Sequence, residues 1–123
     1  MLFRSAQIYG GETPSGVRVW RAYRLPLAVG APAIDAAGCE AVLLDSQKNG
    51  ESFDWNAVRS TISAEGKIIV AGGLDASNVA EAIRVAKPWG VDASSKMETA
   101  PGIKDHEKVR AFVKAALKAG GSR

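Results

Sequence analysis

The sequence predicts an α/β protein whose parallel sheet has about five strands, with helices on its outer face. Segments rich in β-branched residues alternate with segments of helical periodicity. A strand, the turn Gly72-Gly73, a helix and a second strand follow one another between Lys67 and Glu98, which makes one βαβ unit. The run from Ala41 to Leu44 is wholly apolar, as in a strand buried on both faces. Strands that alternate with helices in this way form parallel sheets.

Five strands are predicted, and the link between the first two is too short for a full helix. The residues before Ala6 fit no element, so we expect residues 1–5 to be disordered or foreign to the native fold. The predicted strands are Ala6–Tyr9, Val17–Tyr23, Ala41–Asp45, Ile68–Ala71 and Val91–Ser94.

Three aspartates precede the segments of helical periodicity. Asp54 is expected to cap a helix from Trp55 to Ala64, and Asp75 the helix that Pro88 and Gly90 end. The last helix starts at Asp105. Its apolar residues repeat at the spacing of one buried face, and they are Val109, Phe112, Val113, Ala116 and Leu117.

Length and charge narrow the class of protein. A chain of 123 residues supports a single domain, 1–123, with its own core. The net charge is +3 and the basic residues are interleaved with acids, which argues against a nucleic-acid partner. The one cysteine, Cys39, has no partner for an intrachain disulfide, and no apolar run is long enough to cross a membrane. We therefore expect a cytoplasmic protein without a membrane partner.

Two neighbouring turns predict a phosphate site. Gly72 and Gly73 follow a strand and precede a helix, where backbone N–H groups and the helix dipole favour an anion. Ser94, Ser95 and Lys96 follow the next strand with hydroxyls and a cation. Most glycine pairs after a strand only turn the chain, so the second turn is what strengthens this prediction.

Asp45 is the candidate for acid–base chemistry. It ends the apolar run that starts at Ala41, where a doubly buried parallel strand emerges at its carboxyl end. The alternative is an aspartate in a loop that caps a turn, and spacing alone favours that alternative.

Ordered motifs along nearly the whole chain resemble the C-terminal part of phosphoribosylanthranilate isomerase, from about that family's fourth strand onward. The matching strings are Gln7–Glu12, Val19–Arg24, Leu43–Ser46 with Ser52–Trp55, Ala71–Leu74 with Asn78–Ile83, and Gly90–Ser95 with Glu98 and Pro101–Asp105.

The resemblance implies a partial (βα) TIM barrel and an Amadori rearrangement in tryptophan biosynthesis, a part of aromatic amino acid biosynthesis, on a phosphorylated small-molecule substrate without metal or cofactor. It assigns Asp45 as the general acid that protonates the furanose ring oxygen, and Asp92 as a carboxylate that supports the site. It also assigns the phosphate-binding positions to Gly72, Gly73, Ser95 and Lys96.

The sequence departs from the family pattern at the general base. That base is a cysteine of a Lys-x-Cys-Gly motif on the family's first strand, and no such motif precedes Ala6. An arginine of the family's second strand, thought to hold the anthranilate carboxylate, has no match either. Cys39 precedes the strand of Asp45 and is expected at the opposite end of the barrel. Lys96 stands where the family has glycine after two serines, which keeps the N–H but disfavours positive φ.

Three interpretations stay open. The chain is an isomerase in whole or as a truncated form, a non-catalytic half-barrel that binds phosphosugars, or an inactive fragment. A half-barrel exposes sheet edges and an apolar face, so we also expect a homodimer that covers them, with Ala6–Tyr9 as the contact strand.

Overall fold

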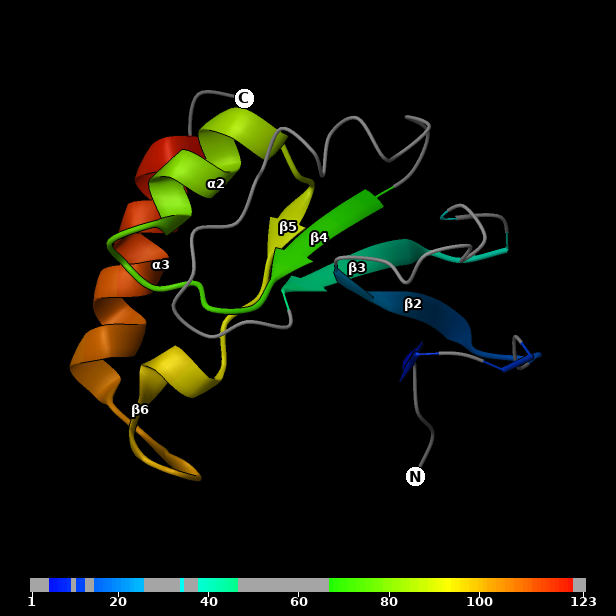
Figure 1. Ribbon diagram of the computed structural model, residues 1–123, viewed down its shortest axis with the longest axis horizontal. Helices are drawn as coiled ribbons and strands as arrows, with labels where there is room; N and C mark the ends of the chain where they lie inside the picture. Colours follow the sequence, from blue (N-terminus) through cyan, green and yellow to red (C-terminus); the bar gives the residue numbers. More distant parts are fainter. Residues whose placement is uncertain are drawn as a thin grey trace.

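Five parallel strands form the main sheet of the protein, seen in a computed structural model that describes residues 5–9, 11–12, 15–25, 34, 38–46 and 67–120 (Figure 1). Their spatial order follows the sequence, and every neighbouring pair among them is parallel. This confirms the predicted sheet. The strands are β1 (Ser5–Ile8), β2 (Arg18–Leu25), β3 (Ala41–Ser46), β4 (Lys67–Ala71) and β5 (Gly90–Val91).

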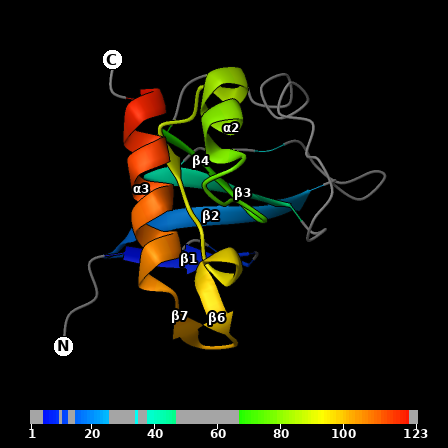
Figure 2. The same ribbon diagram turned by 90° about the vertical axis from the view of Figure 1, so that its left-hand side faces the viewer.

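Two helices cover one face of this sheet. Helices α2 (Val79–Ala86) and α3 (His106–Gly120) lie side by side in front of the strands (Figure 2). The 3-10 helix η1 (Ser95–Met97) leads into a small antiparallel hairpin at the foot of α3, formed by β6 (Glu98–Ala100) and β7 (Ile103–Lys104). None of the described helices is both long and apolar enough to span a membrane.

The main hydrophobic core lies between the sheet and the helices, on what we call the helix face. Its fully buried members come from β3, β4, the segment before α2 and α2 itself, and include Val42, Leu44, Val70, Leu74 and Val79. Burying one such side chain contributes about 1.5–3 kcal/mol. This core fixes β3 and β4, the central strands, against α2 and α3.

A second cluster covers the opposite face of the sheet, which we call the inner face. Its members are small or β-branched apart from one leucine, and they are Ala22, Ala41, Leu43, Ile69 and Ala71. Leu43 belongs to this cluster and Leu44 to the helix face, so β3 is buried on both sides. That confirms the prediction from its unbroken apolar run.

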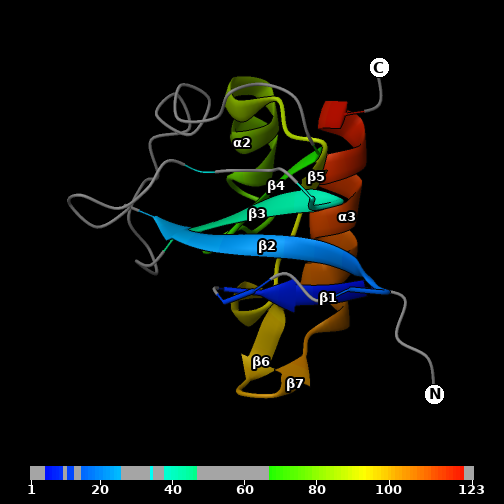
Figure 3. The same ribbon diagram turned by 90° about the vertical axis from the view of Figure 1, so that its right-hand side faces the viewer.

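Several strand boundaries differ from the prediction. Strand β1 begins at Ser5, so this residue belongs to the sheet. Strand β5 ends at Val91 instead of Ser94, because β4 stops at Ala71 and turns away at Gly72. Asp92 makes the last contact, with its N–H donating to the Val70 carbonyl at 2.9 Å. Figure 3 shows β1, β2 and β3 as neighbours within the sheet, with β1 at its edge.

Helix α2 starts later than predicted. The Asp75 carboxylate accepts the Ser77 N–H at 2.8 Å and closes a turn, while the Asn78 side chain accepts the Asp75 N–H at 2.9 Å. Asp75 therefore caps a turn and not the helix itself, which begins at Val79. As expected, the helix ends before Pro88, with Lys87 in the left-handed region at φ 48°.

Helix α3 begins at His106, one residue after the predicted start, and it is less buried than expected. Asp105 Oδ1 accepts the Glu107 N–H at 2.9 Å and the Lys108 N–H at 3.3 Å, an N-cap arrangement. Phe112 is buried, whereas Val113 and Leu117 are 46% and 69% exposed. The expected single buried stripe is wrong, because α3 meets the core through Phe112 and its neighbouring alanines. The helix predicted from Trp55 to Ala64 lies outside the described residues.

Candidate functional site

The carboxyl ends of the parallel strands bring the candidate residues to one edge of the sheet. Arg24 of β2 is paired in register with Asp45 of β3, and Asp45 with Ala71 of β4. Val70 of β4 pairs with Val91 of β5, so the next residues along the two strands, Ala71 and Asp92, lie beside each other. Gly72 follows directly. The two predicted catalytic residues and the glycine turn thus share what we call the carboxyl edge.

Both predicted carboxylates lie on the inner face. Side chains alternate along a strand, so Asp45 shares the face of Ala41 and Leu43, while Leu44 points toward the helices. Asp92 stands between Val91 and Ala93, which both pack against the helix-face core. Asp45 is half-buried and lies within β3, so it is a strand residue and not the loop aspartate of the alternative.

Two further residues gather beside Asp45 that the sequence did not single out. The Tyr9 hydroxyl donates to Oδ2 of Asp45 at 3.4 Å. The guanidinium carbon of Arg24 lies 4.9 Å from the centroid of the Tyr9 ring. The signal that identified Asp45, a polar residue at the carboxyl end of a predicted strand, applies equally to Tyr9 and Arg24.

The glycine turn requires its glycines for their backbone conformation. Gly72 and Gly73 have φ values of 90° and 66°, in the region that other residues rarely adopt. A Cβ on Gly73 would meet nothing within 4 Å, so space is not the constraint. The Asn78 side chain donates to the Gly73 carbonyl at 2.9 Å and fixes the turn to the start of α2.

Ser95 and Lys96 lie in η1, which follows β5 along the chain. The positive charge of Lys96 is the smallest of the effects that lower the pKa of Asp75, so this lysine influences the segment after Gly73. Lys87 is the one non-glycine residue with positive φ among the described residues, so Lys96 carries no such strain. The lysine therefore fits η1 without the conformational cost that its replacement of glycine suggested.

Asp75 adds a negative charge to this corner. The Ser77 hydroxyl donates to its carboxylate and holds the pKa of Asp75 below its ordinary value of 3.8, against a smaller opposing effect of burial. The N–H groups of Ser77 and Asn78 and the charge of Lys96 act in the same direction. These hydrogen-bond donors and the charge of Lys96 partly offset the negative charge of the Asp75 carboxylate. The offset limits its repulsion of an anion bound at the glycine turn.

Glu98 and Lys104 tie the β6–β7 hairpin to the segment before η1. Lys104 Nζ lies 2.9 Å from Glu98 Oε1 and 3.0 Å from the Ser94 carbonyl. This contact with Lys104, followed by the Gly102 N–H, lowers the pKa of Glu98. Lys104 thus joins Glu98 to the segment that ends at Ser94, a contact that the sequence did not indicate.

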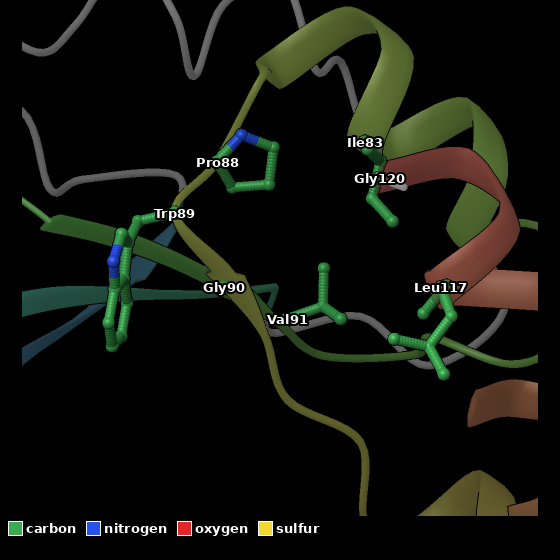
Figure 4. A pocket seen from close by; sticks show the side chains of 8 residues that line it. Ile83, Pro88, Trp89, Gly90, Val91, Leu117 and Gly120 are labelled. Atoms are coloured by element: carbon green, nitrogen blue, oxygen red, sulfur yellow. The ribbon is translucent and has the colours of Figure 1, made fainter. Parts of the chain in front are cut away.

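The opposite, amino edge of the sheet holds two features that do not belong to this site. Cys39 precedes the first residue of β3, about 20 Å along the strand from Asp45. A cavity of about 310 Å³ opens at the start of β5, between α2 and the end of α3 (Figure 4). Its lining is mostly apolar and comprises Ile83, Pro88, Trp89, Gly90, Val91, Ala116, Leu117 and Gly120.

No group of three or more potential metal-ligating side chains occurs among the residues that the structure describes. The polar groups at the carboxyl edge are instead suited to proton transfer, through Asp45 and Tyr9, and to holding an anion. The edge combines a carboxylate on β3 with a positive-φ glycine turn after β4.

Replacing Ser77 with alanine tests the balance of charge at the glycine turn. Loss of the hydroxyl donor raises the pKa of Asp75 toward 3.8, because this hydrogen bond is the largest cause of its depression. The pKa of Asp75 is lower in the folded protein than in the unfolded chain. Its contribution to stability is therefore fully present above the unfolded-state pKa and is lost as pH falls through the folded-state pKa.

Carboxyl carbon chemical shifts, followed by NMR against pH in the wild-type protein and in Ser77→Ala, measure this change. The pKa of Glu98, which Lys104 lowers, serves as the internal control and stays where it was. An unchanged Asp75 titration in the variant contradicts the assignment.

Comparison with known proteins identifies the family. Residues 6–115 match the profile described as N-(5'phosphoribosyl)anthranilate (PRA) isomerase. The N-(5'-phosphoribosyl)anthranilate isomerase of Solibacter usitatus is 41% identical over 95% of this chain and 62% of its own length. That of Myxococcus xanthus is 39% identical over 91% of this chain and 59% of its own length. The chain thus spans about three fifths of these relatives.

Solved structures agree. The crystal structure of TrpF from Jonesia denitrificans superposes with a TM-score of 0.78 at 36% identity, over 98% of this chain and 62% of that protein. Phosphoribosyl anthranilate isomerase from Thermotoga maritima superposes with a TM-score of 0.73 at 26% identity, over 94% of this chain and 62% of that protein. The five-stranded parallel sheet with its helices is therefore shared with these isomerases, and the chain belongs to the N-(5'-phosphoribosyl)anthranilate isomerase family.

Proposed function

We propose that this chain provides the general acid and the phosphate site of a phosphoribosylanthranilate isomerase. The observation that carries the proposal is the shared carboxyl edge, where Asp45 of β3 is in register with Ala71 and is followed across the sheet by Gly72 and Gly73. In (βα) barrels the chemistry takes place at this edge of the strands.

Asp45 is the proposed general acid. The isomerisation opens the ring of an aminoaldose, which requires a proton on the ring oxygen as the bond to the anomeric carbon breaks. A half-buried carboxylate at the end of a rigid, doubly buried strand suits that task. The Tyr9 hydroxyl, 3.4 Å from Oδ2, donates to one carboxyl oxygen of Asp45 and so helps to orient the group.

The phosphate group of the substrate is proposed to bind between the glycine turn and η1. Gly72 and Gly73 let backbone N–H groups approach an anion, and Lys96 adds a positive charge. Ser95 supplies a further backbone amide in the same proposal. Asp92, level with Ala71, is proposed to support the site by holding the polar network at this edge. The reaction so described requires no metal or cofactor.

The proposal assigns no residue of this chain as the general base. The family base is a cysteine, and Cys39 lies about 20 Å away along β3, so it does not serve. This observation favours a second candidate function, the binding of phosphosugars without catalysis. Turnover separates the two candidates, because binding alone leaves the substrate intact.

The Asp45→Asn variant tests the first candidate. Amide replaces acid with little change in shape, so we expect turnover of phosphoribosylanthranilate, followed by its fluorescence, to fall about 10²- to 10⁴-fold. Asp105→Asn is the matched control, since asparagine caps a helix as well as aspartate does.

Equal turnover of Asp45→Asn and the wild-type protein contradicts the assignment of the acid. A folded wild-type chain that binds inorganic phosphate but turns over nothing supports the second candidate and overturns the first. Absence of both activities contradicts both proposals.

We further propose that the chain works as a homodimer in the cytoplasm. Strand β1 pairs only with β2 among the described strands, which leaves an open edge that favours pairing with a second copy. One solved relative, from Thermotoga maritima, is described as a dimeric phosphoribosylanthranilate isomerase from which monomers were generated. A lone cysteine suits a reducing compartment.

Light scattering tests the assembly. We expect about twice the chain mass of 12.9 kDa, and a return to the single mass when Gln7→Pro removes a backbone donor from β1. A wild-type protein that scatters as a monomer at high concentration overturns the homodimer.

A further inference from the structure

Lys104, on the β6–β7 hairpin, joins the residues on either side of η1. Its Nζ lies 3.0 Å from the Ser94 carbonyl oxygen and 3.4 Å from the Ser94 hydroxyl oxygen. The same Nζ lies 2.9 Å from Oε1 of Glu98, the residue that follows η1. An ammonium has three N–H donors, which is the number of these acceptors. Lys104 therefore links Ser94 to Glu98 across the two ends of η1.

The end of η1 at Met97 is held by other contacts. The Met97 side chain is buried in the helix-face core, and the Met97 carbonyl accepts the Asp105 N–H at 2.6 Å. Next to it, Oε2 of Glu98 accepts the Gly102 N–H at 3.1 Å. Ser94, at the other end, is exposed, so its position depends more on Lys104.

The contact at Ser94 also fixes the direction of the next amide. A peptide bond is planar and trans, so the carbonyl of one residue and the N–H of the next point in opposite directions. The Ser94 carbonyl accepts from Lys104 Nζ and, at 3.0 Å, from the Met97 N–H. With that carbonyl held on one side of the peptide, the Ser95 N–H is directed to the other side, away from the Lys104 ammonium.

Glu98 largely cancels the charge of Lys104. Their 2.9 Å contact is an ion pair, and the Glu98 side chain is only 19% exposed. Lys104, followed by the Gly102 N–H, lowers the pKa of Glu98, so this carboxylate is ionised at neutral pH and the pair has no net charge. An anion nearby gains little from such a pair by electrostatic attraction. The contribution of Lys104 is therefore the geometry that it imposes on Ser94.

We propose that Lys104 is a positioning residue for phosphate binding, because it holds the Ser94 carbonyl and so directs the Ser95 N–H toward the anion. The proposal rests on the proposed function, in which Ser95 gives a backbone amide to the phosphate group of the substrate. Lys104 acts through the Ser94–Ser95 peptide and does not itself contact the phosphate.

Inorganic phosphate, titrated by calorimetry into the whole chain, tests the proposal without turnover. Lys104→Met keeps a long side chain but removes its donors, so we expect phosphate affinity to fall about 3- to 10-fold. Lys104→Arg keeps a cation with N–H donors and restores the affinity to within about twofold of the wild-type value. Lys114→Met is the matched control, because it removes the same charge from an exposed position on α3.

Glu98→Gln separates positioning from charge. The amide keeps the shape and an acceptor oxygen but removes the negative partner of Lys104. The ammonium then holds Ser94 less firmly, and we expect phosphate affinity to fall about twofold or more. A Lys104 that attracted phosphate by its charge would instead bind it more tightly once the carboxylate is gone. Tighter binding in Glu98→Gln therefore overturns the proposal.

Backbone ¹⁵N relaxation of the phosphate-free protein tests the positioning itself. In Lys104→Met we expect the order parameter of the Ser95 N–H to fall, while that of Met97, which the core holds, stays unchanged. An equal fall at both residues overturns the proposal, because Lys104 then supports η1 as a whole.

Equal phosphate affinity in Lys104→Met and the wild-type protein overturns the positioning role and leaves the phosphate site standing. An equal loss in Lys114→Met overturns it too, because the effect is then one of net charge. A wild-type protein that binds no phosphate overturns the proposed phosphate site and the role of Lys104 with it. Loss confined to Lys104→Met in a chain without turnover supports the positioning role while the isomerase proposal fails.

Discussion

Parallel pairing of neighbouring strands is the constraint on which the candidate site depends. Because β2 to β5 run in one direction, their carboxyl ends meet at a single edge, and register places Arg24, Asp45 and Ala71 at one level. No loop has to bring these groups together. The apolar cores on both faces of β3 hold that register, since a shift of one residue would turn Leu44 toward the inner face and Asp45 into the helix-face core.

The candidate residues of the carboxyl edge come from different elements of the fold. Asp45 stands on a doubly buried strand, the turn after β4 has two glycines with positive φ, and η1 carries Lys96, whose charge lowers the pKa of Asp75. The apolar cavity beside Trp89 and Leu117 lies at the other edge of the sheet, away from these groups.

Much of this arrangement was predictable from sequence, because buried parallel strands and positive-φ glycines leave local signals. The doubly buried β3 and the cap of α3 at Asp105 are examples. The contact of Tyr9 with Asp45 joins residues 36 positions apart and depends on register, which no local pattern encodes. The β6–β7 hairpin and the exposure of Leu117 likewise depend on tertiary contacts, so periodicity alone predicted the wrong burial.

The central claim is that the carboxyl edge binds an anion at the glycine turn, and NMR mapping of inorganic phosphate tests it most directly. In ¹⁵N-labelled protein, added phosphate is predicted to shift the amide signals of Gly72, Gly73, Ser95 and Lys96. The signals of Trp89 and Gly120, at the cavity on the amino edge, stay unchanged. Shifts confined to the amino edge, or none at millimolar phosphate, would contradict the account.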